Sequence, residues 1–316
     1  MNGPFGWFPS LVPIRRLVRG WLTLPGPKIG VLVQHSPIPL RVPDSYMKLP
    51  KLKPEQAPWI SLVTPSYNQA EFIERTVKSV IDQGYPRLEY VVQDGKSTDG
   101  TNEVLRPYLQ KLTHFESCED NGQAHAINLG VQRTQGEIMA YLNSDDILLA
   151  GALWYVADYF AQRPDVDVIY GHRVVIDEKD EEIGRWVLPP HDDEVMLWLD
   201  YVPQETLFWR RKLWEKVGNR MDESYQFALD WELLTRFHAA GAKFVRVPRF
   251  LAAFRVHALQ KTSMQFNSTG LVEINALRKK IHGRDVSQTE VERKSDPYLR
   301  RSSIYQKLYD LGILRY

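Results

Sequence analysis

The chain has 316 residues, of which 43% are hydrophobic and 25% charged, and its 40 Lys and Arg against 39 Asp and Glu give a formal net charge of +1. This composition is ordinary for a soluble globular protein and excludes the disordered class, which combines low hydrophobicity with high charge. The single cysteine, Cys118, excludes an internal disulfide and any zinc site built on several thiolates. A reducing, cytoplasmic location fits this cysteine content.

Charge divides the sequence into three parts. Residues 1–56 carry eight Lys or Arg against two Asp or Glu, residues 57–258 carry 21 against 31, and residues 259–316 carry eleven against six. We expect a basic and aromatic N-terminal extension, a folded body and a C-terminal appendage with these bounds. The acidic body disfavours nucleic acid as a partner.

The N-terminal extension has two readings. Its aromatic and aliphatic residues are interleaved with arginines, which suits an anionic membrane surface, while the alternative is an arm that packs on its own domain. No uncharged stretch reaches the roughly 20 residues of a membrane-spanning helix. The positive charges follow the first apolar stretch, so we expect no export signal. A peripheral position on the inner face of the cell membrane is the corresponding expectation.

The predicted elements of the body alternate strand and helix. Prolines make residues 25–58 extended, with a short strand around Ile29–Val33. From Trp59 onward, hydrophobic spacing predicts strands at 59–65, 88–94, 114–118 and 137–143, and helices at 70–83, after Ser97 or Thr98, and at 122–133. Strands separated by helices predict parallel βαβ units with helices on both faces of one sheet.

The second half of the body is less regular. A hairpin is predicted from strands 167–176 and 183–187 with the acidic tip 177–182, followed by a helix around 193–200. Another helix begins near Asp230. Helical spacing returns within 270–316, and these helices either pack on the body or mediate self-association into a homo-oligomer.

Polar residues follow the strands of the predicted sheet, where ligands bind in such folds. Asp, Asn and Ser also favour turns, which explains any single cluster. The pair Asp145–Asp146 is harder to explain in this way, because adjacent carboxylates after a buried strand repel each other unless a cation is present. Mg²⁺ or Mn²⁺ suits such oxygen ligands.

Two common nucleotide-binding motifs are missing. No G-x-G-x-x-G follows the first strand, which disfavours a dinucleotide-dependent oxidoreductase. Thr101 stands where a phosphate-binding loop needs lysine, which disfavours an ATPase.

Several segments together resemble family 2 glycosyltransferases. The sequence TPSYNQAEFIERTVKSVIDQGYP (64–86) is followed in order by LEYVVQDGKSTDGT (88–101), NGQAHAINLG (121–130), GEIMAYLNSDD (136–146) and ALDWELLTR (228–236). The resemblance covers roughly residues 57–258. It implies a Rossmann-like A-type glycosyltransferase fold and a divalent metal, Mn²⁺ or Mg²⁺. It also implies transfer with inversion from a uridine- or deoxythymidine-linked sugar to a glycan or lipid-linked acceptor in cell-surface polysaccharide or glycolipid assembly.

The resemblance also implies roles for individual residues. The nucleotide would be bound by Pro65, Tyr67, Asn68, Asp94, Gly122, Gln123, Asn128 and Asp145. The metal would be held by Asp146, with Asp145 and His257 as further ligands. The acceptor side would be formed by Gln204, Glu205, Trp231 and Glu232. Asn143 and Ser144 replace a further acid of the family motif, which leaves open whether Asp145 or Asp146 is the main ligand.

Asp230 matches the general base of the family. Its local pattern alone favours a different role, a first-turn or capping acid that stabilises a helix dipole. Glu232 is the second candidate for the base, and Trp231 is the candidate aromatic platform for a sugar. No Q-x-x-R-W segment follows, which favours transfer of one sugar per encounter.

Two other classes of function remain open from the sequence. A sugar-phosphate nucleotidyltransferase shares the sheet and the metal but needs a glycine- and lysine-rich loop after the first strand, which TPSYNQAEF lacks. An inactive nucleotide-sugar-binding module is disfavoured by the presence of Asp145, Asp146 and Asp230 together.

Overall fold

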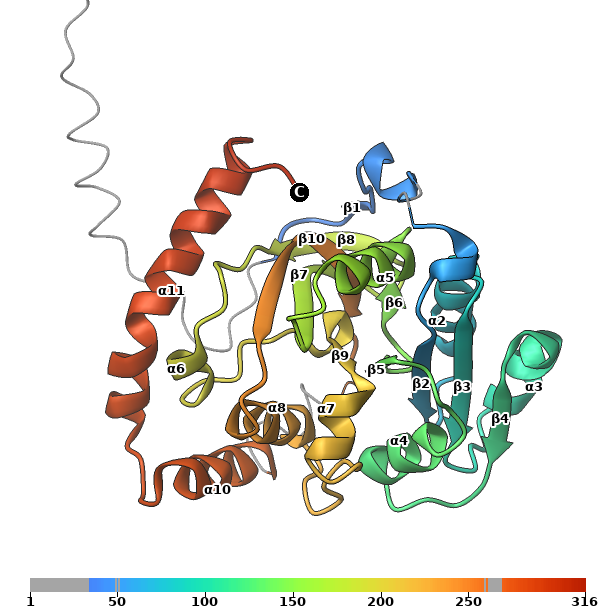
Figure 1. Cartoon of the computed structure of the whole chain (residues 1–316). Coiled ribbons are helices and arrows are strands. Elements are labelled where there is room, and N and C mark those ends of the chain that lie inside the picture. Colours follow the sequence, from blue (N-terminus) through green and yellow to red (C-terminus); the bar gives the residue numbers. More distant parts are fainter. Residues whose placement is uncertain (1–33, 49, 51, 259, 261–268) are drawn as a thin grey trace, which may run out of the picture.

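The computed structural model describes residues 34–48, 50, 52–258, 260 and 269–316 (Figure 1). The strand expected around 29–33 and the arginine-rich start of the N-terminal extension lie outside these residues. Within the described residues, no helix is long and apolar enough to cross a membrane.

Ten strands form one mixed sheet in the described part of the chain. They are β1 (Ile38–Pro39), β2 (Ile60–Ser66), β3 (Leu88–Asp94), β4 (His114–Ser117), β5 (Ile138–Tyr141), β6 (Ile147–Leu148), β7 (Val168–Ile176), β8 (Glu181–Trp186), β9 (Phe208–Arg210) and β10 (Phe244–Arg255). Along the sheet the order is β1-β8-β7-β9-β5-β2-β3-β4, and β10 pairs with β6 and β7 off this path.

The helices connect and flank these strands. The α-helices are α2 (Ile73–Ile81), α3 (Thr101–Leu105), α4 (Gln123–Val131), α5 (Ala152–Gln162), α6 (Asp193–Met196), α7 (Arg211–Lys216), α8 (Leu229–Ala239), α10 (Leu271–His282) and α11 (Gln288–Asp310). Short 3₁₀ helices are η1 (Asp44–Met47), η2 (Pro54–Gln56), η3 (Arg106–Lys111) and η4 (Gln204–Thr206).

The parallel part of the sheet confirms the predicted βαβ units. β2 pairs in parallel with β3 and β5, and β3 pairs in parallel with β4. The predicted hairpin is also confirmed, since β7 and β8 pair antiparallel. The helix expected over 193–200 ends earlier, at Met196, because 3₁₀-type bonds from Leu197 and Trp198 to the carbonyls three residues before them close its last turn.

Two apolar cores lie on opposite faces of the sheet. Leu62 of β2 packs in one core with α2 and α5, while its neighbour Val63 packs in the other with α4 and α8. This alternation follows from the period of two in a strand. A Cβ on Gly130 of α4 would lie 2.5 Å from a methyl carbon of Val63, so the absence of a side chain lets α4 approach β2 closely. The expectation of helices on both faces is therefore confirmed.

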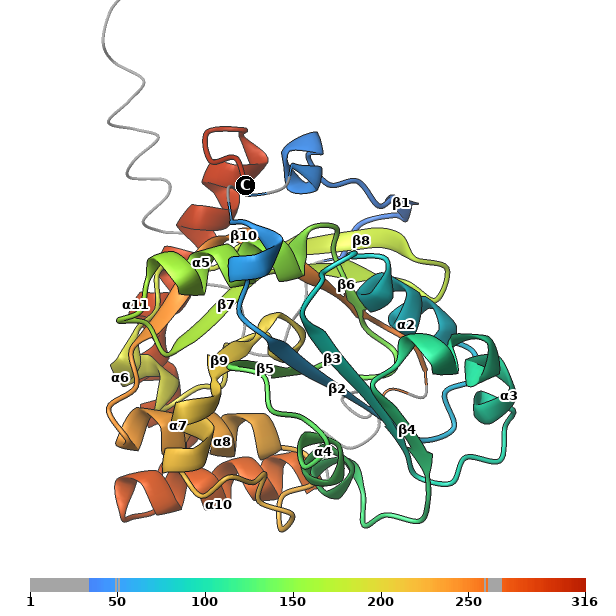
Figure 2. The same ribbon diagram turned by 45° about the vertical axis from the view of Figure 1, so that its right-hand side comes forward.

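The C-terminal helices pack on the body. In both views α10 lies beside α8, and α11 runs past α6 toward the C-terminus (Figures 1 and 2). Leu277 of α10 is buried against Ala228 and Trp231. The ring of Tyr298 of α11 packs against that of Tyr201, with centroids 4.2 Å apart and the planes tilted by 36°. The appendage therefore covers the second half of the body.

Candidate active site

Asp94 ends β3 with its carboxylate fully buried and hydrogen-bonded. Ser97 donates to it from its backbone N–H at 2.9 Å and from Oγ at 2.5 Å, and Ser117 of β4 donates from Oγ at 2.6 Å. The three donors come from neighbouring strand ends, which explains how a carboxylate with no exposed surface is accommodated there. Asp94 therefore has a fixed orientation at the rim of the sheet.

The segment after β2 joins this group. Pro65 is buried in β2, whereas Tyr67 is 64% exposed beside it. Asn68 adopts a left-handed φ of 52°, and its side-chain carbonyl accepts a bond from the Thr98 backbone N–H at 3.0 Å. Its own backbone N–H donates to Ser97 Oγ at 2.7 Å. The structure thus brings Tyr67, Asn68 and Asp94 together on adjacent loops.

A chain of side-chain amides links α4, the end of β5 and η4. Gln123 donates to Asn143 Oδ1 at 2.7 Å, Asn143 donates to Gln204 Oε1 at 3.0 Å, and Gln204 donates to the Tyr141 carbonyl at 2.8 Å. Segments about 80 residues apart in sequence are therefore held together by neutral groups.

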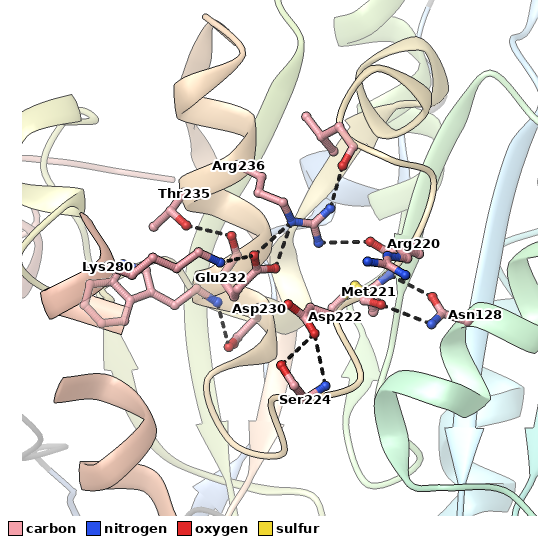
Figure 3. A network of polar contacts seen from close by, with 12 residues as sticks. Asn128, Arg220, Met221, Asp222, Ser224, Asp230, Glu232, Thr235, Arg236 and Lys280 are labelled. Atoms are coloured by element: carbon pink, nitrogen blue, oxygen red, sulfur yellow. Dashed lines mark hydrogen bonds and ion pairs between the residues drawn. The ribbon is translucent and has the colours of Figure 1, made fainter. Parts of the chain in front are cut away.

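The other two residues expected in this region are placed differently. Gly122 precedes α4 with a φ of 104°, and its N–H donates to Asp120. Asn128 uses its side-chain amide on Met221 and Glu223, so it joins α4 to the chain before α8 (Figure 3). A nucleotide-binding role for Asn128 remains a prediction.

Asp145 and His257 form a pair at the start of the acidic motif. His257 Nε2 lies 3.0 Å from Asp145 Oδ2, and the Asp145 side chain keeps 17% of its surface exposed. Asp146 is buried instead, with Oδ1 accepting the Arg255 backbone N–H at 3.0 Å. Burial first, and then the charges of Asp145 and Glu205, raise the pKa of Asp146 well above its ordinary value.

Arg255 holds the backbone of this motif. Its fully buried guanidinium donates to the Asp145 carbonyl at 2.7 Å and to the Asp177 carbonyl at 2.9 Å, and it forms an ion pair with Asp180. Asp177 and Asp180 lie in the turn between β7 and β8, and Arg75 of α2 reaches Asp180 from the other side at 3.1 Å. The acidic motif is thereby attached to the β7–β8 turn.

The residues present fit a divalent cation bound together with a phosphate-bearing ligand. Among the described residues, no group of three or more His, Cys, Asp and Glu side chains could hold a metal by itself. Asp145 and His257 nevertheless bring a carboxylate oxygen and an imidazole nitrogen within 3.0 Å of each other. Mg²⁺ is commonly held by one or two carboxylates plus substrate phosphates, so a small protein donor set is sufficient.

The charges of four carboxylates act on the side chain of one tyrosine, and we call these residues the Tyr141 cluster. Tyr141 is buried, and its pKa is raised well above the ordinary value first by burial and then by the charges of Asp230, Asp200, Asp146 and Glu205. These side chains come from α8, the α6–η4 loop, the β5–β6 loop and η4. The acidic motif and the predicted base therefore share one neighbourhood.

Glu205 is balanced by a cation within this region. Both of its carboxylate oxygens accept a bond of 2.7 Å from Arg173 of β7, and the Arg173 guanidinium lies over the Phe254 ring at 4.3 Å. This two-pronged geometry fixes the Glu205 carboxylate. The Glu205 carboxylate therefore has a fixed orientation and a paired charge.

The first turn of α8 carries three predicted residues, of which Asp230 and Glu232 are labelled in Figure 3. Asp230 accepts a bond from the Trp231 backbone N–H at 2.9 Å. Glu232 is buried and paired with Arg236 at 2.9 Å and Lys280 at 3.6 Å, so two cations already engage its carboxylate. The Trp231 ring is fully buried and donates to the Met196 carbonyl at 2.7 Å, so the expected sugar platform is not supported.

The sequence reading missed Arg173, Asp200 and Arg255. Arg173 and Arg255 are arginines beside apolar runs of their strands, in VIYGHRVVI and LAAFR. A charge in a buried strand is expensive unless it is paired, and this pattern is the signal that could have identified both arginines. Asp200 had no comparable local signal.

The chain belongs to glycosyltransferase family 2. Residues 61–222, half of the chain, match the model described as "Glycosyl transferase family 2". With its central strands β2 to β5 parallel and helices on both faces of the sheet, the fold is the A-type nucleotide-sugar fold that the resemblance implied.

Two relatives illustrate the similarity. Over 92 residues the chain is 44% identical to the putative teichuronic acid biosynthesis glycosyltransferase TuaG of Bacillus subtilis, across 28% of this chain and 36% of TuaG. An uncharacterized glycosyltransferase of Haemophilus influenzae is 25% identical over 247 residues, across 74% of this chain and 75% of that protein. The matched region thus spans only about a third of TuaG.

Two solved structures share the fold. TarS 1-349 of S. aureus in complex with UDP-GlcNAc has a TM-score of 0.59 at 18% identity, covering 79% of this chain and 74% of that chain. The mannosyltransferase PcManGT from Pyrobaculum calidifontis, in complex with GDP-Man and Mn²⁺, has a TM-score of 0.57 at 21% identity, covering 92% and 75%.

Proposed function

We propose that this protein is an inverting glycosyltransferase that moves a sugar from a nucleoside diphosphate to a hydroxyl of a glycan or lipid-linked acceptor. The observation that carries the proposal is that the charges of Asp230, the matched base, and of Asp146, in the acidic motif, both act on the buried Tyr141 side chain. A proton acceptor beside a cation site is the combination that such a transfer needs. The nucleotide-sugars in the titles of the TarS and PcManGT structures support the donor class.

The donor nucleotide would lie against the loops after β2 and β3. Asp94 is buried and oriented by Ser97 and Ser117, so a bond from the imide N–H of a uracil or thymine base would take the place of one that Ser97 donates. Tyr67 is exposed beside it and offers a ring to a base or ribose. Gln123 and Asn143 would fix the loops on the diphosphate side.

A divalent cation, Mn²⁺ or Mg²⁺, would be held by Asp145 and His257, and it would neutralise the leaving diphosphate as a Lewis acid. The buried Asp146 then shapes the motif through its bond to the Arg255 N–H. This assignment favours Asp145 over Asp146 as the main ligand, because the Asp145 carboxylate keeps exposed surface and faces the imidazole.

The transfer step would use Asp230. The acceptor oxygen bonds to the anomeric carbon as its proton passes to the Asp230 carboxylate, and the bond from that carbon to the phosphate oxygen breaks to release the nucleoside diphosphate. Glu205, held by Arg173, and Gln204 would orient the acceptor. A positioned base contributes about 10²- to 10⁴-fold to such a rate.

The cellular setting follows from the relatives and the charge pattern. TuaG is named for teichuronic acid biosynthesis, which supports a role in cell-surface polysaccharide assembly. The basic residues of 1–56 and 259–316 would bring the enzyme to an anionic membrane surface where a lipid-linked acceptor lies.

The test is a donor screen. Thermal shift with Mn²⁺ would first find the nucleotide-sugar that stabilises the protein, and release of nucleoside diphosphate from it would then be measured. Release that requires Mn²⁺ supports the proposal. Release of pyrophosphate from a nucleoside triphosphate and a sugar phosphate would show a nucleotidyltransferase instead, and binding without any release would show an inactive module.

A further inference from the structure

Glu273 of α10 binds the chain that leads into α8. Its Oε1 accepts the Gln226 backbone N–H at 2.8 Å, and its Oε2 accepts those of Phe227 and Ala228 at 2.7 and 2.9 Å. Ala228 is the N-cap residue of α8 and has no side-chain acceptor of its own. One carboxylate from a helix 45 residues later in the chain therefore satisfies three successive donors before α8.

Other contacts from α10 reach the same turn. Leu277 packs against Ala228 and Trp231, and the Arg278 guanidinium lies 5.7 Å from the centre of the Trp231 ring. Lys280 pairs with Glu232 at 3.6 Å (Figure 3). The residues on both sides of Asp230 are thus fixed by α10.

We propose that Glu273 is a positioning residue that sets the orientation of Asp230 for proton transfer. The inference rests on the proposed function, in which Asp230 is the base. Asp230 lies two residues after Ala228. The backbone that Glu273 holds therefore sets the position from which the Asp230 side chain projects. A misplacement of about 1 Å can cost about 100-fold in rate, and charge-assisted bonds to three N–H groups are strong enough to prevent it.

A purely structural role for Glu273 predicts different behaviour. Loss of a packing contact lowers stability and affects donor binding and turnover alike. Loss of a positioning contact lowers kcat while donor affinity stays the same, because Glu273 binds the backbone before α8 and not the proposed donor loops after β2 and β3.

The experiment uses the full chain with Glu273→Ala and Glu273→Gln, and Glu290→Ala as the matched control. Glu290 also lies in the appendage and pairs with Arg284 at 2.6 Å, away from the chain before α8. We expect Glu273→Ala to lower kcat about 10- to 100-fold with donor Kd within twofold. Glu273→Gln keeps one carbonyl acceptor and should fall between wild type and Glu273→Ala, whereas Glu290→Ala should match wild type.

Two further measurements decide the outcome. In an Asp230→Asn background, Glu273→Ala should lower the residual turnover less than twofold, since its effect acts through Asp230. Amide hydrogen exchange of residues 224–231 should accelerate in Glu273→Ala while β2 to β5 stay protected. An undiminished loss of turnover in the Asp230→Asn background, or unchanged exchange, would overturn the proposal.

Failure of the proposed function would look different. If the wild type released nothing from any donor, the glycosyltransferase proposal would fall, and hydrogen exchange would still show whether Glu273 holds the segment. If Asp230→Asn turned over at the wild-type rate, the base assignment and the role of Glu273 would fall together while donor release remained.

Discussion

The two halves of the sheet offer different chemistry at the candidate site. Around β2, β3 and β4 the side chains are mainly hydroxyls and amides, and the buried acid Asp94 is satisfied by Ser97 and Ser117. Around β7 and β10 they are charged, with Arg173 on Glu205 and Arg255 on the acidic motif. Directional neutral bonds suit the recognition of a base, whereas charges suit phosphate departure and proton transfer.

Under the proposed function, this division would make donor recognition and transfer separable. A change in the first half should alter donor affinity, and a change in the second half should alter turnover, cation dependence or the stability of the acidic motif.

Asp230→Asn should have the largest effect. We expect kcat to fall about 10²- to 10⁴-fold, equivalent to about 3–5 kcal/mol of barrier, because the amide cannot accept the acceptor proton. Donor Kd, measured by calorimetry with Mn²⁺, should stay unchanged. A variant that kept wild-type kcat would place the proton acceptor elsewhere.

Arg255→Met should have the second-largest effect. The buried guanidinium holds two carbonyls and Asp180, so its loss should lower the free energy of unfolding by about 3 kcal/mol. Arg75→Met is the matched control, because Arg75 pairs with the same Asp180 from a partly exposed position and should cost about 1 kcal/mol or less. Denaturant unfolding measures both, and equal losses would remove the special role of Arg255.

Asp145→Ala should weaken donor binding in Mn²⁺ about 100-fold, or about 2.8 kcal/mol. The reason is the loss of the exposed carboxylate that faces His257. Calorimetry of the wild type with a chelator should give the same reduced affinity, and the variant should no longer respond to the chelator. A chelator response that survives in Asp145→Ala would assign the cation to other residues.

Ser117→Ala should have the smallest effect, and it tests the half of the sheet around β2, β3 and β4. It removes one bond to Asp94 and should raise the donor KM about fivefold, corresponding to about 1 kcal/mol, with kcat unchanged. Ser303→Ala on α11, whose hydroxyl bonds only to the Leu299 carbonyl among the described contacts, should alter neither value. A fall in kcat for Ser117→Ala would contradict the division.

Sequence patterns predicted the structure best in the half of the sheet around β2, β3 and β4. Apolar runs bounded by turn residues located β2 to β5 within one or two residues, because these strands are short and β2, β5 and most of β3 are buried, although β4 is only partly buried. The second half contains short strands such as β6 and β9 and pairs residues far apart in sequence, so local pattern could not place Arg173 beside Glu205.

Neighbours in sequence were also a poor guide to neighbours at the site. Trp231 was expected to face a sugar because it adjoins Asp230, yet successive residues on a helix point about 100° apart. The Trp231 ring therefore turns into the core while Asp230 contributes to the Tyr141 cluster.

The long separation between Asp145 and its partners has a consequence during synthesis. Arg255 and His257 follow it by 110 and 112 residues, so a nascent chain carries the acidic motif long before the side chains that hold it exist. A chain truncated before residue 255 cannot assemble the centre, even though β2 to β5 are already complete. Premature termination in this interval would therefore yield fragments that retain the loops after β2 and β3 but lack Arg255 and His257, the partners of Asp145.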